Sequence, residues 1–394
     1  MTALAPEAIQ PAIEQALAQT AFIDIHTHLF SPAFEGLGLW GIDELLTYHY
    51  LEAELFRFSP VTPLDYFALN KQQQADLIWR TLFVENAPVS ESARGVIAVL
   101  NAFGLPTTAA DLREARQFFR AQDIDRHISH VFELAGISEA VMTNDPADPA
   151  EQRFWENGVA PDPRFHPVLR LDRILSGGRS AAEVRGALDA VSSRMHPVYM
   201  AISLPDTFVY PAAEPTAVLL RDAVLPCCRE LKIPLSLMIG VRRQVNPAIR
   251  LAGDGVGRAD LRAVETLCRD FPDNRFLVSV LSRENQHELC VYARKFANLM
   301  PFGCWWFLNN PSIVEEITRE RIEMLGLSFI PQHSDARVLE QVIYKWRNTR
   351  RTLAPILTHS WKVLAEDGRP VSREDIEDGV RRLFRGNFEK ITAH

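Results

Sequence analysis

The sequence lacks the features that mark several large classes of protein. No apolar run approaches the length of a membrane span, so we expect no membrane segment. The first twenty residues contain no Lys or Arg, which argues against a secretory leader. The five cysteines show no C-x-x-C spacing, a pattern typical of reduced thiols, so a cytoplasmic location is expected. No Gly-rich phosphate loop follows the first apolar run, which disfavours an open, doubly wound nucleotide-binding sheet.

An excess of positive charge is also missing. The formal net charge of the 394 residues is −8, so no overall basic field exists to attract nucleic acid or an anionic membrane. The composition, 47% hydrophobic and 23% charged, is that of an ordinary globular protein. We therefore expect a small-molecule partner, and an assembly of identical chains is compatible with the sequence.

The most informative segment is the apolar run that begins at Phe22 and ends in two histidines. β-Branched residues in this run predict a buried strand. His26 and His28 are two residues apart, and side chains at that spacing point to the same face of a strand. Imidazole is the commonest protein ligand for a divalent transition metal. A metal site is therefore predicted, although a single buried histidine more often serves as a hydrogen-bonded core residue.

The remainder of the chain alternates apolar runs with helical stretches. Strands that alternate with helices predict a parallel sheet, and eight of them predict a (β/α)8 TIM-like barrel, an α/β fold. Residues 31–138 read as a helical insertion after the first strand. The predicted division is 1–30 for the N-terminal helix and first strand, 31–138 for the insertion, and 139–394 for the rest of the barrel with its closing helices. The further strands are predicted at 139–143, 165–169, 198–203, 235–239, 276–281, 301–307 and 327–331.

Chemistry in such a barrel lies where the strands end. Asp335 follows the last apolar run and would lie beside the first strand in a closed barrel, where it could complete a His/His/Asp metal site or move protons. The alternative interpretation makes Asp335 the N-cap of the next helix. Arg170 and Arg337 are candidates for binding a carboxylate, although a lone arginine is more often a salt-bridge residue.

Two aromatic segments remain open on the residues alone. One of Trp305 and Trp306 must face inward if both lie in a strand, and its indole could then stack on a sugar or exclude water. The run from Tyr48 through His49 to Tyr50 lies in the insertion and could act as a lid, with tyrosine as an acid or base. An ordinary amphipathic helix face explains it equally well.

These segments together resemble the uronate isomerase (glucuronate isomerase) family, a divergent branch of the amidohydrolase superfamily. The match covers nearly the whole chain and keeps the family's motif order. The paired tryptophans and the late Asp-x-Arg are fairly specific, whereas the His-x-His is shared across the superfamily. Four segments carry the resemblance, namely 24–30, 48–50 with Arg57, 302–309 and 334–337.

The resemblance implies aldose–ketose isomerisation of a hexuronate, such as glucuronate or galacturonate, through an enediol. A divalent metal ion, with zinc as the first choice, would be bound by His26, His28 and Asp335. Tyr50, beside His49, and Asp335 would be the proton-transfer groups. The substrate-binding residues that the resemblance implies are Arg170 and Arg337 for the carboxylate, and Trp306 for the sugar.

One departure from the family bears on activity. The family carries a histidine at the end of strand five, where this chain has Met238, and a thioether is a poor ligand in an oxygen/nitrogen site. His333, two residues before Asp335, could face the same side and partly replace the missing imidazole. Two alternatives therefore stay open: a metal-dependent hydrolase or lyase acting on another carboxylated small molecule, and a non-catalytic sugar-acid binder.

Overall fold

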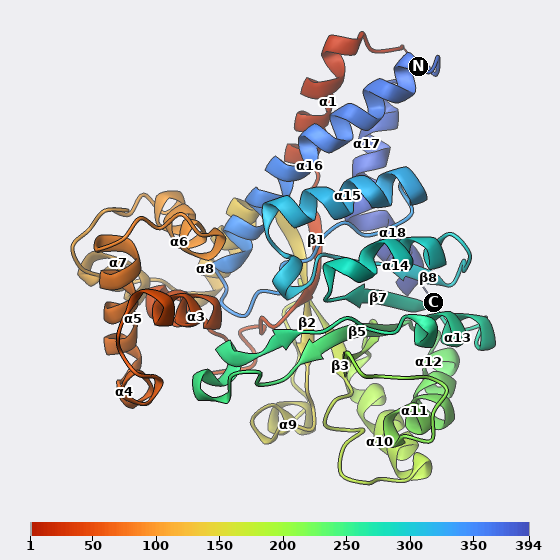
Figure 1. Ribbon diagram of the computed structural model, residues 1–394, viewed down its shortest axis with the longest axis horizontal. Coiled ribbons are helices and arrows are strands. Elements are labelled where there is room, and N and C mark those ends of the chain that lie inside the picture. Colours follow the sequence, from red (N-terminus) through yellow and green to blue (C-terminus); the bar gives the residue numbers. More distant parts are fainter. Residues whose placement is uncertain (1, 394) are drawn as a thin grey trace.

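A curved sheet of parallel strands forms the centre of the molecule, as the computed structural model, which describes residues 2–393, shows (Figure 1). The strands follow the order β1-β2-β3-β4-β5-β7-β8, and the short β6 pairs antiparallel with β5. The predicted α/β barrel class is confirmed. The strands are β1 (Phe22–Thr27), β2 (Ile137–Asn144), β3 (Phe165–Arg170), β4 (Met200–Pro205), β5 (Leu235–Arg242), β6 (Gly255–Val256), β7 (Phe276–Val280) and β8 (Leu299–Pro301).

The closing side of the barrel differs from the prediction. The run expected at 301–307 is a strand only as far as Pro301, and the run expected at 327–331 contributes a single bridge, between Ile330 and Phe302. Single backbone hydrogen bonds then replace a regular ladder: Asp335 N–H donates to the His26 carbonyl (3.2 Å) and His28 N–H donates to the Ala336 carbonyl (2.7 Å). The last segment therefore lies beside β1, as the barrel model requires, without strand geometry.

The strands are buried on both faces, as expected for a parallel sheet covered by helices. Inside the barrel, side chains such as Ile23, Val141 and Leu277 form one apolar cluster. On the outside, Phe22 and its neighbours pack against the helices in a second, larger cluster. Because strand side chains alternate between faces, neighbours such as Phe22 and Ile23 belong to different clusters.

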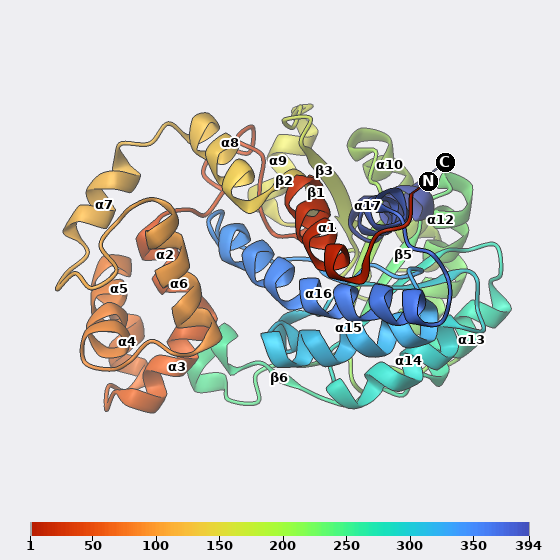
Figure 2. The same ribbon diagram turned by 90° about the horizontal axis from the view of Figure 1, so that it is seen from above.

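The regular elements of the insertion between β1 and β2 are all helices, and the insertion has an apolar cluster of its own. In Figures 1 and 2 it lies to one side of the barrel, drawn in orange. The domain boundaries given for it above stay a prediction. It comprises α2 (Ile42–Leu46), α3 (His49–Phe58), α4 (Pro63–Ala68), α5 (Lys71–Trp79), the π-helical turn η1 (Arg80–Val84), α6 (Glu91–Ala102), α7 (Arg113–Arg120) and α8 (Ile124–Ala135).

Local signals in the sequence define many helix ends. The α10 helix begins with a reciprocal capping box between Ser180 and Glu183, and α8 ends at Gly136, which adopts a left-handed conformation (φ 64°). The helices between the later strands are α9 (Pro149–Glu156), α10 (Ala181–Met195), α11 (Pro215–Leu219), η2 (Leu220–Val224), α12 (Leu225–Leu231), η3 (Pro247–Gly253), α13 (Arg262–Asp270), η4 (Arg283–Asn285) and α14 (Gln286–Ala293), and the last strand is followed by η5 (Trp306–Leu308) and α15 (Pro311–Leu325).

The expected closing helices pack together with the N-terminal helix α1 (Pro6–Gln19). They are α16 (Gln341–Glu366), α17 (Arg373–Arg381), η6 (Arg382–Gly386) and α18 (Asn387–Thr392). The long α16 packs against α1 and α15, and also against α6 and α8 of the insertion, so it joins the two parts of the molecule (Figure 2). Among the described residues, none of these helices combines the length and the apolar character that crossing a bilayer demands.

Candidate active site

An irregularity in β1 directs His26 into the barrel. The register runs from Asp24 opposite Ala140 to Thr27 opposite Met142, so β1 advances three residues while β2 advances two. One extra residue in a strand is a β-bulge, and bulges change the direction in which a side chain points. As a result Ile25 packs in the interior cluster, and the next residue, His26, also faces inward.

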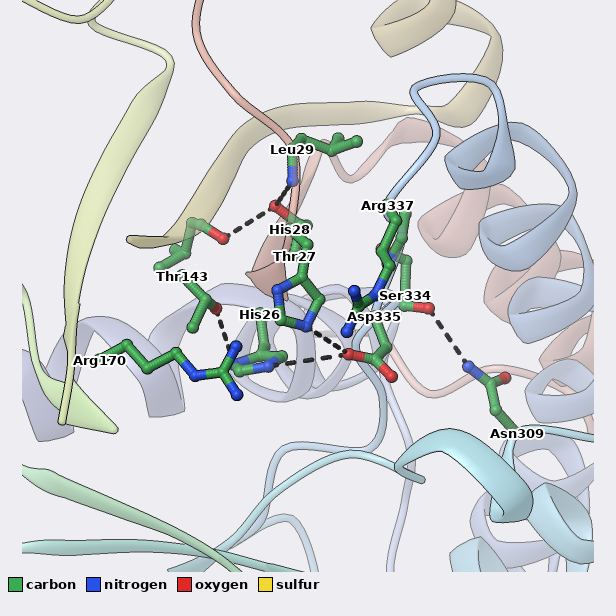
Figure 3. A network of polar contacts seen from close by, with 12 residues as sticks. His26, Thr27, His28, Leu29, Thr143, Arg170, Asn309, Ser334, Asp335 and Arg337 are labelled. Atoms are coloured by element: carbon green, nitrogen blue, oxygen red, sulfur yellow. Dashed lines mark hydrogen bonds and ion pairs between the residues drawn. The ribbon is translucent and has the colours of Figure 1, made fainter. Parts of the chain in front are cut away.

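His26, His28 and Asp335 converge at this end of the barrel (Figure 3). The Oδ1 atom of Asp335 lies 3.7 Å from Nε2 of His26 and 3.4 Å from Nε2 of His28. One ligand atom from each residue falls within 4.8 Å of the other two, a spacing that a metal ion can bridge. β1 itself ends at Thr27, so His28 reaches the group from just beyond the strand.

The hydrogen bonds of His26 define its tautomer. The Tyr199 hydroxyl donates to the carbonyl of Ile25 (2.7 Å), so its oxygen is left to accept from the Nδ1–H of His26 (3.1 Å). The Nε2 lone pair of His26 therefore faces Asp335. Burial lowers the pKa of His26 to about 3 and lowers that of His28 well below its usual range, so both rings are neutral, the state that binds metals.

The loop that carries Asp335 is held by a second carboxylate, the buried side chain of Asp24, which contacts the residue before Asp335. The backbone N–H of Ser334 donates to Oδ1 of Asp24 (3.0 Å), and Nε1–H of Trp346 donates to Oδ2 (2.8 Å). Burial raises the pKa of Asp24 to about 6, while these hydrogen bonds act to lower it. Asp335 itself adopts φ 53°, a left-handed conformation that costs a non-glycine residue free energy unless its surroundings hold it.

The alternative interpretation of Asp335 as a helix N-cap is wrong, because the residue that precedes α16 is Glu340. Sequence reasoning missed Asp24 and Tyr199. A signal for Asp24 existed, since a single acidic residue inside an apolar strand must find partners when buried. Tyr199 gave no such signal.

A cavity opens over the His/His/Asp group. Its walls carry arginines and carboxylates from several strand ends together with aromatic side chains. Arg243 is held at the wall by Asp254 (2.5 Å), and its guanidinium lies 5.9 Å from the centre of the Trp306 ring. Such a mixture of charged and aromatic groups suits a polar ligand that also has an apolar face. The other charged wall residues are Arg170, Asp172 and Arg337.

The two predicted anion-binding arginines both line the cavity but differ in their partners. Arg170 forms a two-point contact with Asp172, Nε to Oδ2 at 3.0 Å and Nη2 to Oδ1 at 3.3 Å. Arg337 forms no ion pair with any carboxylate of residues 2–393 within 4 Å. Figure 3 shows the two side chains reaching toward the group from opposite sides. Arg337 is therefore the guanidinium whose charge is left for a ligand.

Both tryptophans line the cavity, although neither lies in the strand that was expected there. Trp305 is buried, and Trp306 begins the 3-10 turn η5 with φ 46°. The Trp306 ring stacks on Phe307, with centroids 4.7 Å apart. The backbone turn after β8, rather than strand alternation, brings both indoles to one cavity.

The insertion contributes Tyr48 and His49 to the cavity wall. These two residues form the N-terminal end of α3, with Tyr48 as its N-cap. Tyr50 is not among the described wall residues. It packs behind Tyr48 (centroids 5.0 Å apart), with Nζ of Lys345 5.6 Å from its ring centre. Burial lowers the pKa of His49 to about 3 and raises that of Tyr50 well above its usual range.

Met238, which stands where a histidine was expected, lies in the barrel interior, and so does His333, the imidazole that could replace it. Met238 is buried in the inner apolar cluster and is not a wall residue of the cavity. His333 is fully buried, its ring centre is 5.2 Å from that of His26, and neither ring nitrogen has a hydrogen-bond partner among the described residues. Among the described residues, the group of potential His, Cys, Asp and Glu ligands does not include His333.

Comparisons with known proteins show which family the chain belongs to. No protein-family model matches it, and a search of curated proteins finds no match. A solved uronate isomerase from Bacillus halodurans C-125 superimposes with a TM-score of 0.97 at 44% identity, over 100% of this chain and 98% of that one. A uronate isomerase from Thermotoga maritima gives a TM-score of 0.73 at 14% identity, over 99% of this chain and 100% of that one.

A glucuronate isomerase from Caulobacter crescentus gives a TM-score of 0.65 at 16% identity, over 98% of this chain and 94% of that one. The two more distant matches share the fold, whereas the match at 44% identity extends over the full length of the chain. The chain therefore belongs to the uronate isomerase family, within the amidohydrolase superfamily, and is an enzyme.

Proposed function

We propose that this enzyme is a metal-dependent aldose–ketose isomerase of hexuronates, which converts glucuronate or galacturonate to the corresponding ketouronate. The observation that carries the proposal is the convergence of His26, His28 and Asp335 beneath a cavity that also presents an arginine without a carboxylate partner. An open-chain hexuronate offers matching groups, with a carbonyl and hydroxyl at one end and a carboxylate at the other.

The donor set fits a divalent metal ion such as zinc. Two neutral imidazoles and one carboxylate are a common zinc ligand set that leaves a coordination position open. Oδ1 of Asp335 is buried and accepts no hydrogen bond in the described structure, which supports a role for this atom as a ligand. A bound divalent metal would supply polarisation of the substrate's carbonyl and hydroxyl oxygens.

The isomerisation moves one proton from C2 to C1 and one from O2 to O1 through an enediol. Tyr50 packs behind Tyr48 and His49 and is not a wall residue of the cavity, and its raised pKa keeps its phenol protonated at neutral pH, so any part that it takes in proton transfer runs through these two neighbours. His49 is neutral, and its Nε2 atom is buried without a partner among the described residues, so it can exchange a proton with a ligand in the cavity. Asp335 is the third candidate for proton transfer.

Arg337 binds the substrate carboxylate in this proposal, because Arg170 is already paired with Asp172. Arg170 then orders the cavity wall and adds positive potential near developing negative charge. Trp306 offers a ring face on which the sugar can pack.

The test combines a metal analysis with an assay for ketose formation from D-glucuronate and D-galacturonate. We expect about one zinc ion per chain and turnover that is lost in Asp335→Asn and His26→Asn. His359→Asn, at an exposed position on α16, is the matched control and should keep both properties. In D2O, an enediol route incorporates deuterium at C1 of the ketose, whereas direct hydride transfer does not.

Two results would overturn the proposal in favour of the alternatives. Turnover of an ester, lactone or amide panel without any turnover of hexuronates would indicate a hydrolase. Tight uronate binding without turnover, retained in metal-free protein, would indicate a sugar-acid binder.

A further inference from the structure

Another buried carboxylate, that of Glu340, connects the barrel to the insertion. Its side chain is fully buried, and both carboxylate oxygens accept from the backbone N–H of Gly41 at 3.1 Å. Nε2 of His127 lies 2.7 Å from Oε1. A carboxylate removed from water in this way is stable only while its partners stay in place.

The two partners of Glu340 come from opposite ends of the insertion. Gly41 is the N-cap of α2, the helix that ends just before Tyr48 and His49 of the cavity wall. His127 lies in α8, the last helix of the insertion before β2. One side chain therefore contacts both the beginning and the end of the insertion.

On the barrel side, Glu340 ends the loop that carries Asp335 and Arg337. Backbone contacts run alongside this link: Leu39 forms a parallel bridge with Val338, and the N–H of Leu339 donates to the Leu39 carbonyl (2.9 Å). The loop and the start of the insertion therefore lie against each other in one fixed register.

The surroundings of His127 make the link sensitive to change. Aromatic rings of Trp40, Phe103 and Phe119 lie around the imidazole with centroids 5.5, 5.5 and 5.8 Å away. In this apolar setting a group that loses its partner stays buried, so it costs its full desolvation penalty.

We propose that Glu340 is a positioning residue for the isomerase reaction: it sets the distance between the Tyr48–His49 wall and the Asp335–Arg337 loop. This inference depends on the proposed function, because its kinetic readout is hexuronate turnover. Glu340 is neither a wall residue of the cavity nor a member of the His26, His28 and Asp335 group, so the proposed role runs through the elements that it joins.

The test compares Glu340→Ala and Glu340→Gln with the wild type. Glu340→Ala removes the link, and we expect kcat to fall about 10- to 100-fold with zinc content unchanged, because small displacements of reacting groups cost that much. Hydrogen exchange should accelerate in residues 41–58 and stay unchanged in β5 and β7. Glu340→Gln keeps an acceptor for Gly41 and an amide for the other imidazole tautomer, so it should recover most of kcat.

The matched control is Glu139→Gln. Glu139 also pairs with a histidine, His166, at 2.7 Å, but it lies near the start of β2, at the barrel end opposite the cavity. A loss of thermal stability without a change in kcat is expected there.

Three outcomes separate the explanations. The positioning role would be overturned if the Glu340→Ala protein lost stability but kept the wild-type kcat and the wild-type exchange rates of residues 41–58. Equal losses of kcat in Glu340→Gln and Glu340→Ala would overturn it as well. A wild-type protein inactive on hexuronates would refute the proposed function instead, and the exchange experiment would still decide whether Glu340 holds residues 41–58 in place.

Discussion

The carboxylate of Asp24 accepts a hydrogen bond from the backbone N–H of Ser334, across 310 residues of sequence. The contact joins the first strand to the residue that precedes Asp335. It thereby holds the two histidines of the β1 end and the late carboxylate in one frame. The strained backbone of Asp335 (φ 53°) persists because this frame constrains it.

The first prediction concerns Asp24→Asn. Both oxygens of Asp24 accept from N–H donors, so either orientation of an asparagine amide places its NH2 group against a donor. We expect a loss of about 1–3 kcal/mol in the free energy of unfolding, measured in urea, together with weaker zinc binding. The exposed Asp378→Asn is the control. An unchanged stability and zinc affinity would show that Asp24 does not support the site.

The second prediction concerns Tyr199→Phe. This change removes the acceptor that fixes the Nδ1–H of His26 and leaves only Thr143, whose Oγ1 lies 3.3 Å away. Partners of metal-binding histidines typically contribute 10–100-fold in metal affinity or activity, so a loss of about that size is expected. Zinc affinity is measured by competition with a chelator.

The control for Tyr199→Phe is Tyr210→Phe. Tyr210 is buried in the outer apolar cluster, and its hydroxyl makes no hydrogen bond with any described residue. Equal zinc affinities in the two variants would exclude an orienting role for Tyr199.

The third prediction concerns Met238, the position where the resemblance led us to expect a histidine. Its side chain packs in the barrel interior away from the cavity wall, so Met238→Leu should keep zinc content and cost less than about 1.5 kcal/mol in stability. Loss of the metal in this variant, with the fold intact by circular dichroism, would mean that the thioether takes part in binding.

The fourth prediction concerns the cysteines. All five are buried and free, and burial raises the pKa of the thiols of Cys227, Cys290 and Cys304 to about 11 and that of Cys268 to about 12. A raised pKa lowers the thiolate fraction, so the native protein should not react with Ellman's reagent at pH 8, whereas the unfolded chain should release all five equivalents. A fast-reacting native thiol would contradict the burial.

The barrel class could be predicted because its signals are local. Apolar runs with intervening helical stretches mark six of the eight strands within a few residues. The prediction was wrong at 301–307 and 327–331, where the chain has an apolar sequence but no regular ladder. Tertiary contacts overrode the strand propensity of these segments. Trp306, within the first, and Asp335, just after the second, both adopt left-handed backbone conformations and line the cavity.

The sequence by itself determined the fold class and the identity of the three convergent residues, because strand periodicity and a histidine pair are visible over a few positions. Only the tertiary structure decided what orients them. The bulge at His26, the Tyr199 hydroxyl, the buried Asp24 and the Glu340 link all depend on contacts between distant segments, and no short-range pattern encodes which buried donor will meet which acceptor.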